Sequence, residues 1–331
     1  MNIRSVKAQR GPFPWKRGVA AIRGLALGHY VVYLGFIIIL IIFSIVLRND
    51  GFLTPSNLLN IVQQTTPITV MAVGTVFVLT AGEIDLSIGS TVALSALVAA
   101  IVLRGHDMTF GVFAGLAVGS TVGLVNGIFV TRLGLPSFLV TLATMGIVAG
   151  FARRLTDLQS VPITNDLFVD IFGSGRLGPI GSLVIWTLLA LTIGHFFFRE
   201  TRFGAHVLAI GDSSSSARAA GIKVDRVRLS VFVLSACCAA LAGLLYAGRL
   251  QGARYTLGES DLMTVIAAVI VGGTRLTGGS GSVPGALVGS LLMGMLNNGL
   301  ILMGLSVSEQ MIVRGGIILA AVSFSMRDKT R

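Results

Sequence analysis

The stretch "GLAVGSTVGLVNGIFVTRLGLPSFLVTLATMGI" at 115–147 consists of two apolar runs separated by Gly134-Leu135-Pro136. It aligns without a gap with "GALVGSLLMGMLNNGLILMGLSVSEQMIVRGGI" at 285–317. The identities are spread over both runs: Gly115/Gly285, Val118/Val288, Gly119/Gly289, Ser120/Ser290, Gly134/Gly304, Leu135/Leu305, Gly146/Gly316 and Ile147/Ile317. The match predicts an internal repeat, although glycine-rich helices also resemble one another by composition alone.

The rest of the chain is just as apolar. Its 331 residues are 53% hydrophobic and 12% charged, include 42 glycines and have a mean hydropathy of +0.87. A soluble domain has no core large enough for so much apolar surface. We therefore expect an all-α, polytopic membrane protein with about ten transmembrane helices. The expected spans are 30–47, 67–81, 87–103, 109–131, 136–152, 179–198, 229–248, 263–274, 285–303 and 310–326.

The basic residues indicate how these spans are oriented. With ten spans both termini lie on one side, and most of the 25 Lys and Arg residues fall in 1–29, 199–228 and 327–331. Basic loops stay in the cytoplasm. We therefore expect a cytoplasmic N-terminal segment (1–29), one transmembrane domain (30–326) with a cytoplasmic loop at 199–228, and a cytoplasmic tail (327–331). The two copies of the repeat then run in opposite directions, which is typical of transporters whose halves rock about a central site.

Composition and motifs exclude several classes of protein. The formal charge of +11 does not indicate nucleic-acid binding, because no nucleic-acid motif accompanies it. The adjacent Cys237 and Cys238 are expected to pack between helices, and the scattered histidines have no ligand spacing, so neither a metal nor a cofactor is expected. The chain lacks a GxxxxGK[ST] phosphate loop. It is therefore not expected to be an enzyme, and if ATP drives it, another chain binds the ATP and Mg.

The basic loop contains "LAIGDSSSSARAAGIKVDRVRLS" at 208–230. Asp212 or Ser213 can cap a short helix that runs to about Ala220, and Gly221 suits its C-terminal cap. A short helix of small side chains at a membrane surface is either a solvated connector or a docking helix for a cytoplasmic partner. The residues of this candidate docking helix are Gly211, Asp212, Ala217, Arg218, Ala219, Ala220 and Gly221.

Polar side chains interrupt the apolar runs at a few places. In "LTAGEIDLSIGS" at 79–90, Asp85 either caps the following helix or lines a path, and Glu83 either lines a path or is solvated at the inner surface. Amides inside spans either bond between helices or meet a polar solute. We expect Arg314 to pair with Glu309 as a structural lock. The candidate pathway residues are Glu83, Asp85, Ser87, Asn126, Thr141, Asn297 and Asn298.

Four segments together resemble the membrane permeases of bacterial ABC importers for monosaccharides of the ribose, arabinose, xylose and galactose type: 79–90, 122–145, 201–222 and 267–300. The resemblance implies a permease subunit in the inner membrane that dimerises and moves an uncharged, hydroxyl-rich solute inward by alternating access. It also implies that ATPase subunits engage 211–222 as a coupling helix, and that a sugar-binding protein docks from the periplasmic or extracellular side. The second permease is either an identical or a different chain.

The sequence departs from that family in two places. Glu83 stands where the second glycine of Gly-Gly-Ile-Asp-Leu-Ser is usual, and Leu262 and Thr264 stand where a Glu-x-Asp pair is usual, with Glu259 and Asp261 three residues earlier. These departures leave the identity of the sugar open. Two alternatives remain: a permease of amino-acid or nucleoside ABC importers, and an ion-driven secondary transporter with a cation site at Glu83 and Asp85.

Overall fold

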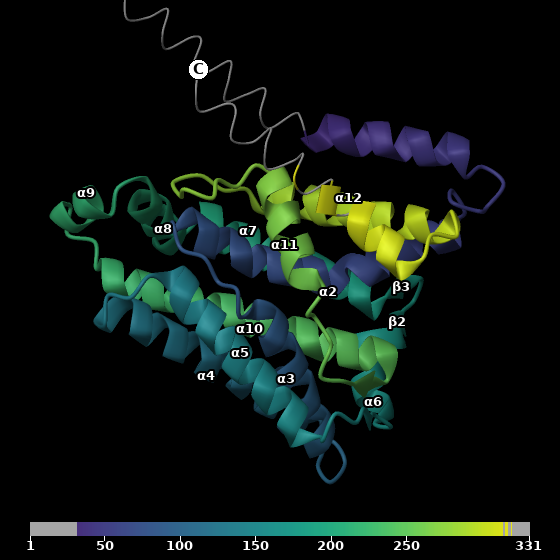
Figure 1. The fold of residues 1–331 in the computed structure, drawn as a ribbon, viewed down its shortest axis with the longest axis horizontal. Helices are drawn as coiled ribbons and strands as arrows, with labels where there is room; N and C mark the ends of the chain where they lie inside the picture. Colours follow the sequence, from purple (N-terminus) through teal and green to yellow (C-terminus); the bar gives the residue numbers. More distant parts are fainter. Residues whose placement is uncertain (1–31, 314, 317–318, 320–331) are drawn as a thin grey trace, which may run out of the picture.

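The chain folds almost wholly into α-helices that pack side by side (Figure 1). The computed structural model describes residues 32–313, 315–316 and 319. The helices in chain order are Val32–Val46, α2 (Pro55–Thr80), α3 (Ile88–Val102), α4 (Met108–Arg132), α5 (Ser137–Leu155), α6 (Asp166–Val169), the π-helical turn η1 (Asp170–Ser174), α7 (Ser182–Arg199), α8 (Arg202–Asp212), α9 (Ser214–Ala219), α10 (Val224–Leu250), α11 (Asp261–Val271), α12 (Val283–Leu302) and a last helix that begins at Val307. Two small antiparallel ladders join β1 (Val161–Pro162) to β4 (Gly252–Ala253) and β2 (Arg176–Leu177) to β3 (Ile180–Gly181).

Six of these helices are long and apolar enough to cross a membrane: α2, α4, α5, α7, α10 and α12. Three shorter apolar helices, Val32–Val46, α3 and α11, accompany them. The described part of the chain therefore confirms a multi-pass, all-α membrane protein. The expected span 310–326 falls mostly outside the described residues, as do the segments 1–29 and 327–331.

Helix α2 begins at Pro55, so the prediction that this span begins near Pro67 is wrong. The Thr54 hydroxyl accepts a hydrogen bond from the Asn57 amide (3.4 Å), and Pro55 occupies the first turn, where its missing amide proton is not needed. Polar residues at 63–66 lower the hydropathy of this first half and conceal it. Pro67 therefore lies inside α2. A proline within a membrane helix is tolerated where neighbouring groups satisfy the freed backbone atoms.

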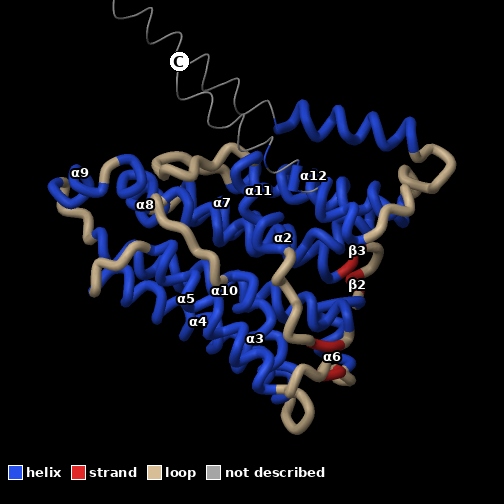
Figure 2. The backbone as a smooth tube through the Cα atoms, in the orientation of Figure 1, coloured by secondary structure: helices blue, strands red, loops and turns tan. Residues whose placement is uncertain are grey.

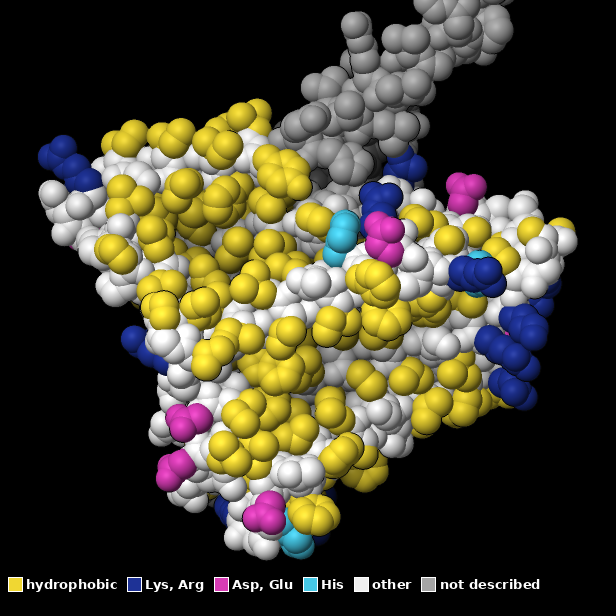
Figure 3. Space-filling view, turned by 180° about the vertical axis from the view of Figure 1, so that it is seen from behind, with side chains coloured by type: hydrophobic (Ala, Val, Ile, Leu, Met, Phe, Trp, Pro, Cys, Tyr) yellow, Lys and Arg dark blue, Asp and Glu magenta, His cyan; other side chains and the backbone are white. Residues whose placement is uncertain are grey.

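The central helices are α2 and α10, which contact each other. Helix α2 also packs against α12, α11 and α7, whereas α10 packs against α4 and α3. The outer helices α4, α5 and α7 leave large apolar side chains exposed, among them Phe113 (68%), Ile147 (59%) and Ile193 (53%). Figure 3 shows how widely such side chains cover one face. A face of this extent is suited to lipid rather than to water.

The loops gather at two opposite ends of the bundle (Figure 2). One end, the α9 end, carries α8, α9 and residues 272–282, whose Gly278 and Gly279 lie against Gly211 and Asp212. The other end, the strand end, carries the four strands, α6 and η1. Lys and Arg side chains gather at the α9 end (Figure 3), where α8 to the first turns of α10 contribute Arg202, Arg218, Lys223, Arg226 and Arg228.

Helices α4 and α12, which hold the first halves of the two copies of the repeat, make equivalent contacts with the central helices. Ser120 of α4 lies 3.3 Å from the Cys237 sulfur of α10, and its equivalent Ser290 of α12 lies 2.7 Å from the Thr69 hydroxyl of α2. Helix α4 runs antiparallel to α10 and ends at the α9 end, whereas α12 runs antiparallel to α2 and starts there. The two helices therefore run in opposite directions.

Close approach of α4 to α10 depends on glycine. A Cβ atom at Gly119 would lie 2.5 Å from the Ala236 carbonyl oxygen and 2.6 Å from the Ala240 Cβ, whereas a Cβ at Gly146 on α5 would meet nothing within 4 Å. We predict that Gly119→Ala lowers the free energy of unfolding by about 1–3 kcal/mol through overpacking. Gly146→Ala serves as the matched control and should leave stability equal or slightly higher. Thermal unfolding of both variants in detergent measures the difference, and equal losses would contradict this packing.

Candidate functional site

The seven residues 81–87 connect α2 to α3 without helical structure, and we call residues 83–87 of this connection the inner break. Gly82 turns the chain out of α2 with a φ of +78°, a value that residues with a Cβ rarely adopt. At Ile84, the amide donates to the Ser137 hydroxyl (3.2 Å) and the carbonyl accepts from the Thr141 hydroxyl (3.2 Å). Helix α5 therefore satisfies both backbone groups of Ile84 within the inner break.

Asp85 is the centre of a buried polar network. Its carboxylate accepts hydrogen bonds from the Ser87 amide (3.0 Å), the Ser87 hydroxyl (2.6 Å) and the Ser235 hydroxyl of α10 (3.1 Å). The Asn126 amide of α4 donates to the Ser87 hydroxyl (2.9 Å). Asp85 is 5% exposed and Asn126 is fully buried. The expected cap is confirmed in part, because Asp85 accepts from Ser87, the residue directly before α3.

Glu83 is buried and ion-paired. Its carboxylate lies 2.9 Å from Nε of Arg228 in α10, and the two side chains are 9% and 27% exposed. The interpretation of Glu83 as a solvated residue at the inner surface is therefore wrong. Arg228 and Ser235 were not predicted, because a basic residue near a loop and a serine in an apolar run carry no signal before the fold brings them to the inner break.

The predicted pathway residues divide between two places. Glu83, Asp85, Ser87, Asn126 and Thr141 lie together at the inner break. Asn298 instead exchanges two hydrogen bonds (2.9 and 3.0 Å) with Asn57, in the first turn of α2. Because the inner break follows the last turn of that 26-residue helix, about 39 Å away along its axis, Asn298 and its neighbour Asn297 are not part of this site.

The expected lock between Glu309 and Arg314 falls partly outside the described residues, because Arg314 is not among them. Glu309 accepts hydrogen bonds from the amide and the hydroxyl of Ser306 (2.7 Å each), and the Glu309 amide lies 3.3 Å from the Ser306 hydroxyl. These reciprocal bonds form a capping box at the start of a helix. Glu309 therefore has a local structural role.

A second connection, residues 251–260 between α10 and α11, resembles the inner break, and we call it the outer break. It starts at the strand end with β4 and carries Glu259 just ahead of α11. Glu259 pairs with Arg153 of α5 (2.8 Å), and Asp261 accepts from the Tyr246 hydroxyl of α10 (2.6 Å). A Glu-x-Asp pair thus stands near the start of each short helix, with the glutamate paired to an arginine and the aspartate bonded to a hydroxyl group of α10, and the outer glutamate is more exposed than the inner one.

The two breaks approach each other inside the bundle. A Cβ at Gly89, in the first turn of α3, would lie 2.7 Å from the Gly258 carbonyl oxygen of the outer break. Helix α3 then continues to the strand end, and α11 continues to the loop 272–282 at the α9 end. The N-termini of two short helices therefore meet between the ends, in the manner of the broken helices of transporters.

The short helix predicted in this loop is α9, and a second helix, α8, ends directly before it. α8 ends at Asp212, and α9 follows, capped by Ser213, whose hydroxyl accepts from the Ser216 amide (3.3 Å). Asp212 is therefore not the cap. Gly221 follows α9 with a φ of +83°, as expected for a helix end. Among the predicted coupling residues Ala217 is buried, whereas Asp212, Arg218, Ala219, Ala220 and Gly221 are exposed and Gly211 is half-buried.

Helix α8 lies directly against the end of α2. A Cβ at Gly211 would overlap the Thr80 carbonyl, which accepts a hydrogen bond from the Gly279 amide (2.9 Å). No side chain fits between α8 and Thr80, so the two backbones touch. The surface that α9 presents at the α9 end is thereby connected by contact to the residues that lead into the inner break.

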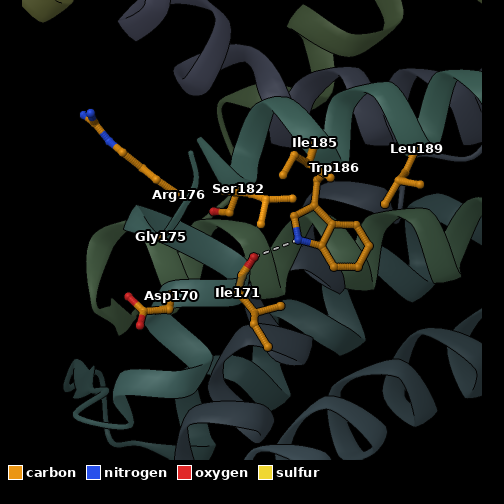
Figure 4. A pocket seen from close by; sticks show the side chains of 9 residues that line it. Asp170, Ile171, Gly175, Arg176, Ser182, Ile185, Trp186 and Leu189 are labelled. Atoms are coloured by element: carbon orange, nitrogen blue, oxygen red, sulfur yellow. Dashed lines mark hydrogen bonds between the residues drawn. The ribbon is translucent and has the colours of Figure 1, made fainter. Parts of the chain in front are cut away.

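A groove of about 420 Å³ lies at the strand end, between η1, β2 and α7 (Figure 4). Trp186 closes one side and donates to the Ile171 carbonyl (2.9 Å). Its ring stacks on Phe172 at 5.2 Å. None of the predicted pathway residues lines this groove, and it lies away from both Glu-x-Asp pairs.

These features define a multi-pass helical membrane protein with two polar breaks inside its bundle. The family model described as "Branched-chain amino acid transport system / permease component" matches residues 57–322. The chain belongs to this permease family. No solved structure matches the chain.

Several relatives carry the name of a sugar. The chain is 40% identical over 294 residues to a ribose import permease of Bacillus subtilis, covering 88% of this chain and 90% of that protein. It is 37% identical over 275 residues to an L-arabinose ABC transporter permease of Azospirillum brasilense (82% and 80%) and 35% identical over 292 residues to a D-allose transport system permease of Escherichia coli (87% and 89%). The resemblance to permeases of monosaccharide ABC importers is confirmed.

We predict that Asp85→Ala lowers the free energy of unfolding by about 2–4 kcal/mol, because it leaves buried hydroxyl and amide donors without their acceptor. Asp157→Asn is the control, since the Asp157 side chain is 82% exposed, pairs with the equally exposed Arg154 and has a φ of +47° that asparagine tolerates better than alanine; it should change stability by less than about 1 kcal/mol. Denaturant unfolding in detergent measures both. A loss at Asp85 no larger than the loss at Asp157 would contradict the network.

Proposed function

We propose that the chain is the transmembrane permease subunit of an ATP-binding-cassette importer that moves a monosaccharide or a similar polyol inward by alternating access. The observation that carries the proposal is the likeness to ribose, arabinose and allose permeases over more than four fifths of the chain. Contacts to an uncharged sugar need hydroxyl, amide and carboxylate groups. The two breaks supply these groups at positions that neighbouring helices hold.

The proposed architecture has about ten spans in an inverted repeat, with α2 to α5 as one half and α10 to the last helix as the other. The equivalent contacts of Ser120 and Ser290 support this pairing, as does the position of each break between a long central helix and a short helix. The basic residues at the α9 end support an inner-membrane location in which this end, the segment 1–29 and the tail 327–331 are cytoplasmic. Residues 30–326 are then a single transmembrane permease domain.

The proposed solute path passes the inner break. Asn126 and Ser87 offer amide and hydroxyl groups there, and Asn126 Oδ1 is buried without a hydrogen-bond partner among the residues that the structure describes. A water or a sugar hydroxyl can donate to that oxygen. Because Asn126 is fully buried, a solute reaches it only after the surrounding helices move apart. Alternating access requires such a movement.

The proposed partners follow from the two ends. Cytoplasmic ATPase subunits, which bind the ATP and Mg, engage α8 and α9, while a sugar-binding protein docks at the strand end. A second permease, identical or different, completes the path in the lipid membrane. The exposed Ser215, Ser216, Ala219 and Ala220 give α9 the small side chains that fit a groove in a partner.

The family description favours one alternative, a permease for branched-chain amino acids. An ion-driven secondary transporter is the other, although both acids of the inner break already have partners in Arg228, Ser87 and Ser235. Uptake into proteoliposomes separates the three, using the permease with its ATPase subunits and binding protein and a panel of labelled ribose, arabinose, allose and leucine.

ATP-dependent uptake of one sugar, without leucine uptake, is the expected result. Leucine uptake in place of sugar uptake would replace the proposed substrate class. Uptake driven by a proton or sodium gradient, with the ATPase subunits omitted, would overturn the proposal.

Ala219→Trp should uncouple the importer, because a bulky ring on the exposed face of α9 prevents α9 from fitting its partner. Ala217 is not used for this test, because it lies on the buried side of α9. We expect sugar uptake to fall about tenfold or more, which corresponds to a loss of about 1.4 kcal/mol or more of docking. Ala219→Ser is the matched control and should keep uptake. The measurement is uptake together with the amount of ATPase that co-purifies, and retention of both by Ala219→Trp would contradict the docking role.

A further inference from the structure

We propose that the Glu83–Arg228 ion pair is the link through which movement of α9 reaches the polar network around Asp85, so that both are positioning residues for transport. This inference rests on the proposed function, because it requires α8 and α9 to receive the movement of the ATPase subunits. The pair itself is an observation: Nε of Arg228 and Oε1 of Glu83 are 2.9 Å apart.

The first step of the argument is that α9 and the start of α10 are fastened together. Residues 220–223 are all that separates them, and within this connection the Ile222 amide bonds to the Ala217 carbonyl (3.1 Å). Across the turn, Nη2 of Arg218 on α9 lies 3.0 Å from the carboxylate of Asp225 on α10. A displacement of α9 therefore displaces the first turns of α10.

The second step is that α10 holds the inner break at two points on one face. Arg228 and Ser235 are two helical turns apart, so their side chains leave α10 on the same side. Arg228 binds Glu83 and Ser235 binds Asp85, alternate residues of the extended break. Ser235 alone would join the break to α10 at one point, while α5 and α4 hold Ile84 and Ser87. The ion pair supplies a second point on α10, so a movement of α10 acts on the break at two residues.

The third step concerns the charges. The Glu83 side chain is only 9% exposed, so water competes weakly for it, and opposite charges attract more strongly there than at an open surface. A pair in this environment resists separation when α10 moves. The family resemblance leads us to expect glycine at position 83, and glycine has no side chain to make this link. The inference therefore concerns this chain's own mechanism of coupling.

The test compares the amount of sugar moved per ATP hydrolysed in Glu83→Gln, Arg228→Gln and the double variant E83Q/R228Q. Each single variant leaves one charge in a poorly solvated place and is expected to lower stability, whereas the double variant leaves none and is expected to fold. We expect the double variant to hydrolyse ATP at the wild-type rate and to move about fivefold less sugar per ATP, the lower end of coupling between distant sites. Arg228→Lys, which keeps the charge, should move more sugar per ATP than the double variant and less than the wild type.

The matched control is R154Q/D157N, which removes an exposed ion pair of the same 2.9 Å length at the strand end and should keep the wild-type ratio. A folded double variant with the wild-type ratio would overturn the inference, because the pair would then be structural only. If Arg228→Lys lost as much sugar moved per ATP as the double variant, the inference would also be overturned, because the charge at position 228 would then not be what couples the helices. Absence of ATP-dependent uptake in the wild-type complex would instead defeat the proposed function, so the two failures are distinguishable.

Discussion

Polar groups inside a membrane, of the backbone and of side chains alike, must find their partners within the protein, and this constraint accounts for how the inner break is built. The inner break leaves the helical ladder for only a few residues, yet it draws on three other helices. Helix α5 bonds Ile84 on both sides, α10 bonds Glu83 and Asp85, and α4 bonds Ser87. The break is therefore surrounded by protein rather than by lipid, and the side chains that stabilise it are also those that can meet a polar solute.

Hydropathy predicts uniformly apolar helices better than helices that carry polar stretches. The expected runs at 109–131, 136–152 and 285–303 agree with α4, α5 and α12 to within a few residues, because long apolar stretches are unambiguous. The first half of α2 was missed, since its polar residues are satisfied inside the bundle: the Thr66 hydroxyl lies 2.9 Å from that of Thr187, and Asn57 pairs with Asn298. A central helix surrounded by other helices can carry such residues, and a hydropathy average does not distinguish it from a loop.

The same limit applies to the candidate site. Asp85, Ser87, Asn126 and Thr141 could be selected because polar residues in apolar runs are costly and need partners. Their partners Arg228 and Ser235 could not, since a long-range pair depends on how α10 packs beside α2 and α3 rather than on any local pattern. Glu83 shows the difference most clearly. From the sequence it could be solvated or buried, and only the position of Arg228 decides between the two.

The short helices α3 and α11 are explained once the breaks are counted with them. A crossing of about 30 Å needs about 20 helical residues, whereas α3 has 15 and α11 has 11. The inner break extends the crossing of α3 from the α9 end, and the outer break extends the crossing of α11 from the strand end, so each half-helix is completed by the extended segment before it. The two breaks enter from opposite ends and meet where Gly89 faces Gly258. Both breaks are bonded to α10 and to α5, but at opposite ends: Glu83 pairs with Arg228 in the first turns of α10, whereas Glu259 pairs with Arg153 in the last turn of α5. Under the proposed function, a tilt of these helices can loosen the bonds at one end while those at the other end are kept, and alternating access requires this because the path must never be open at both ends at once.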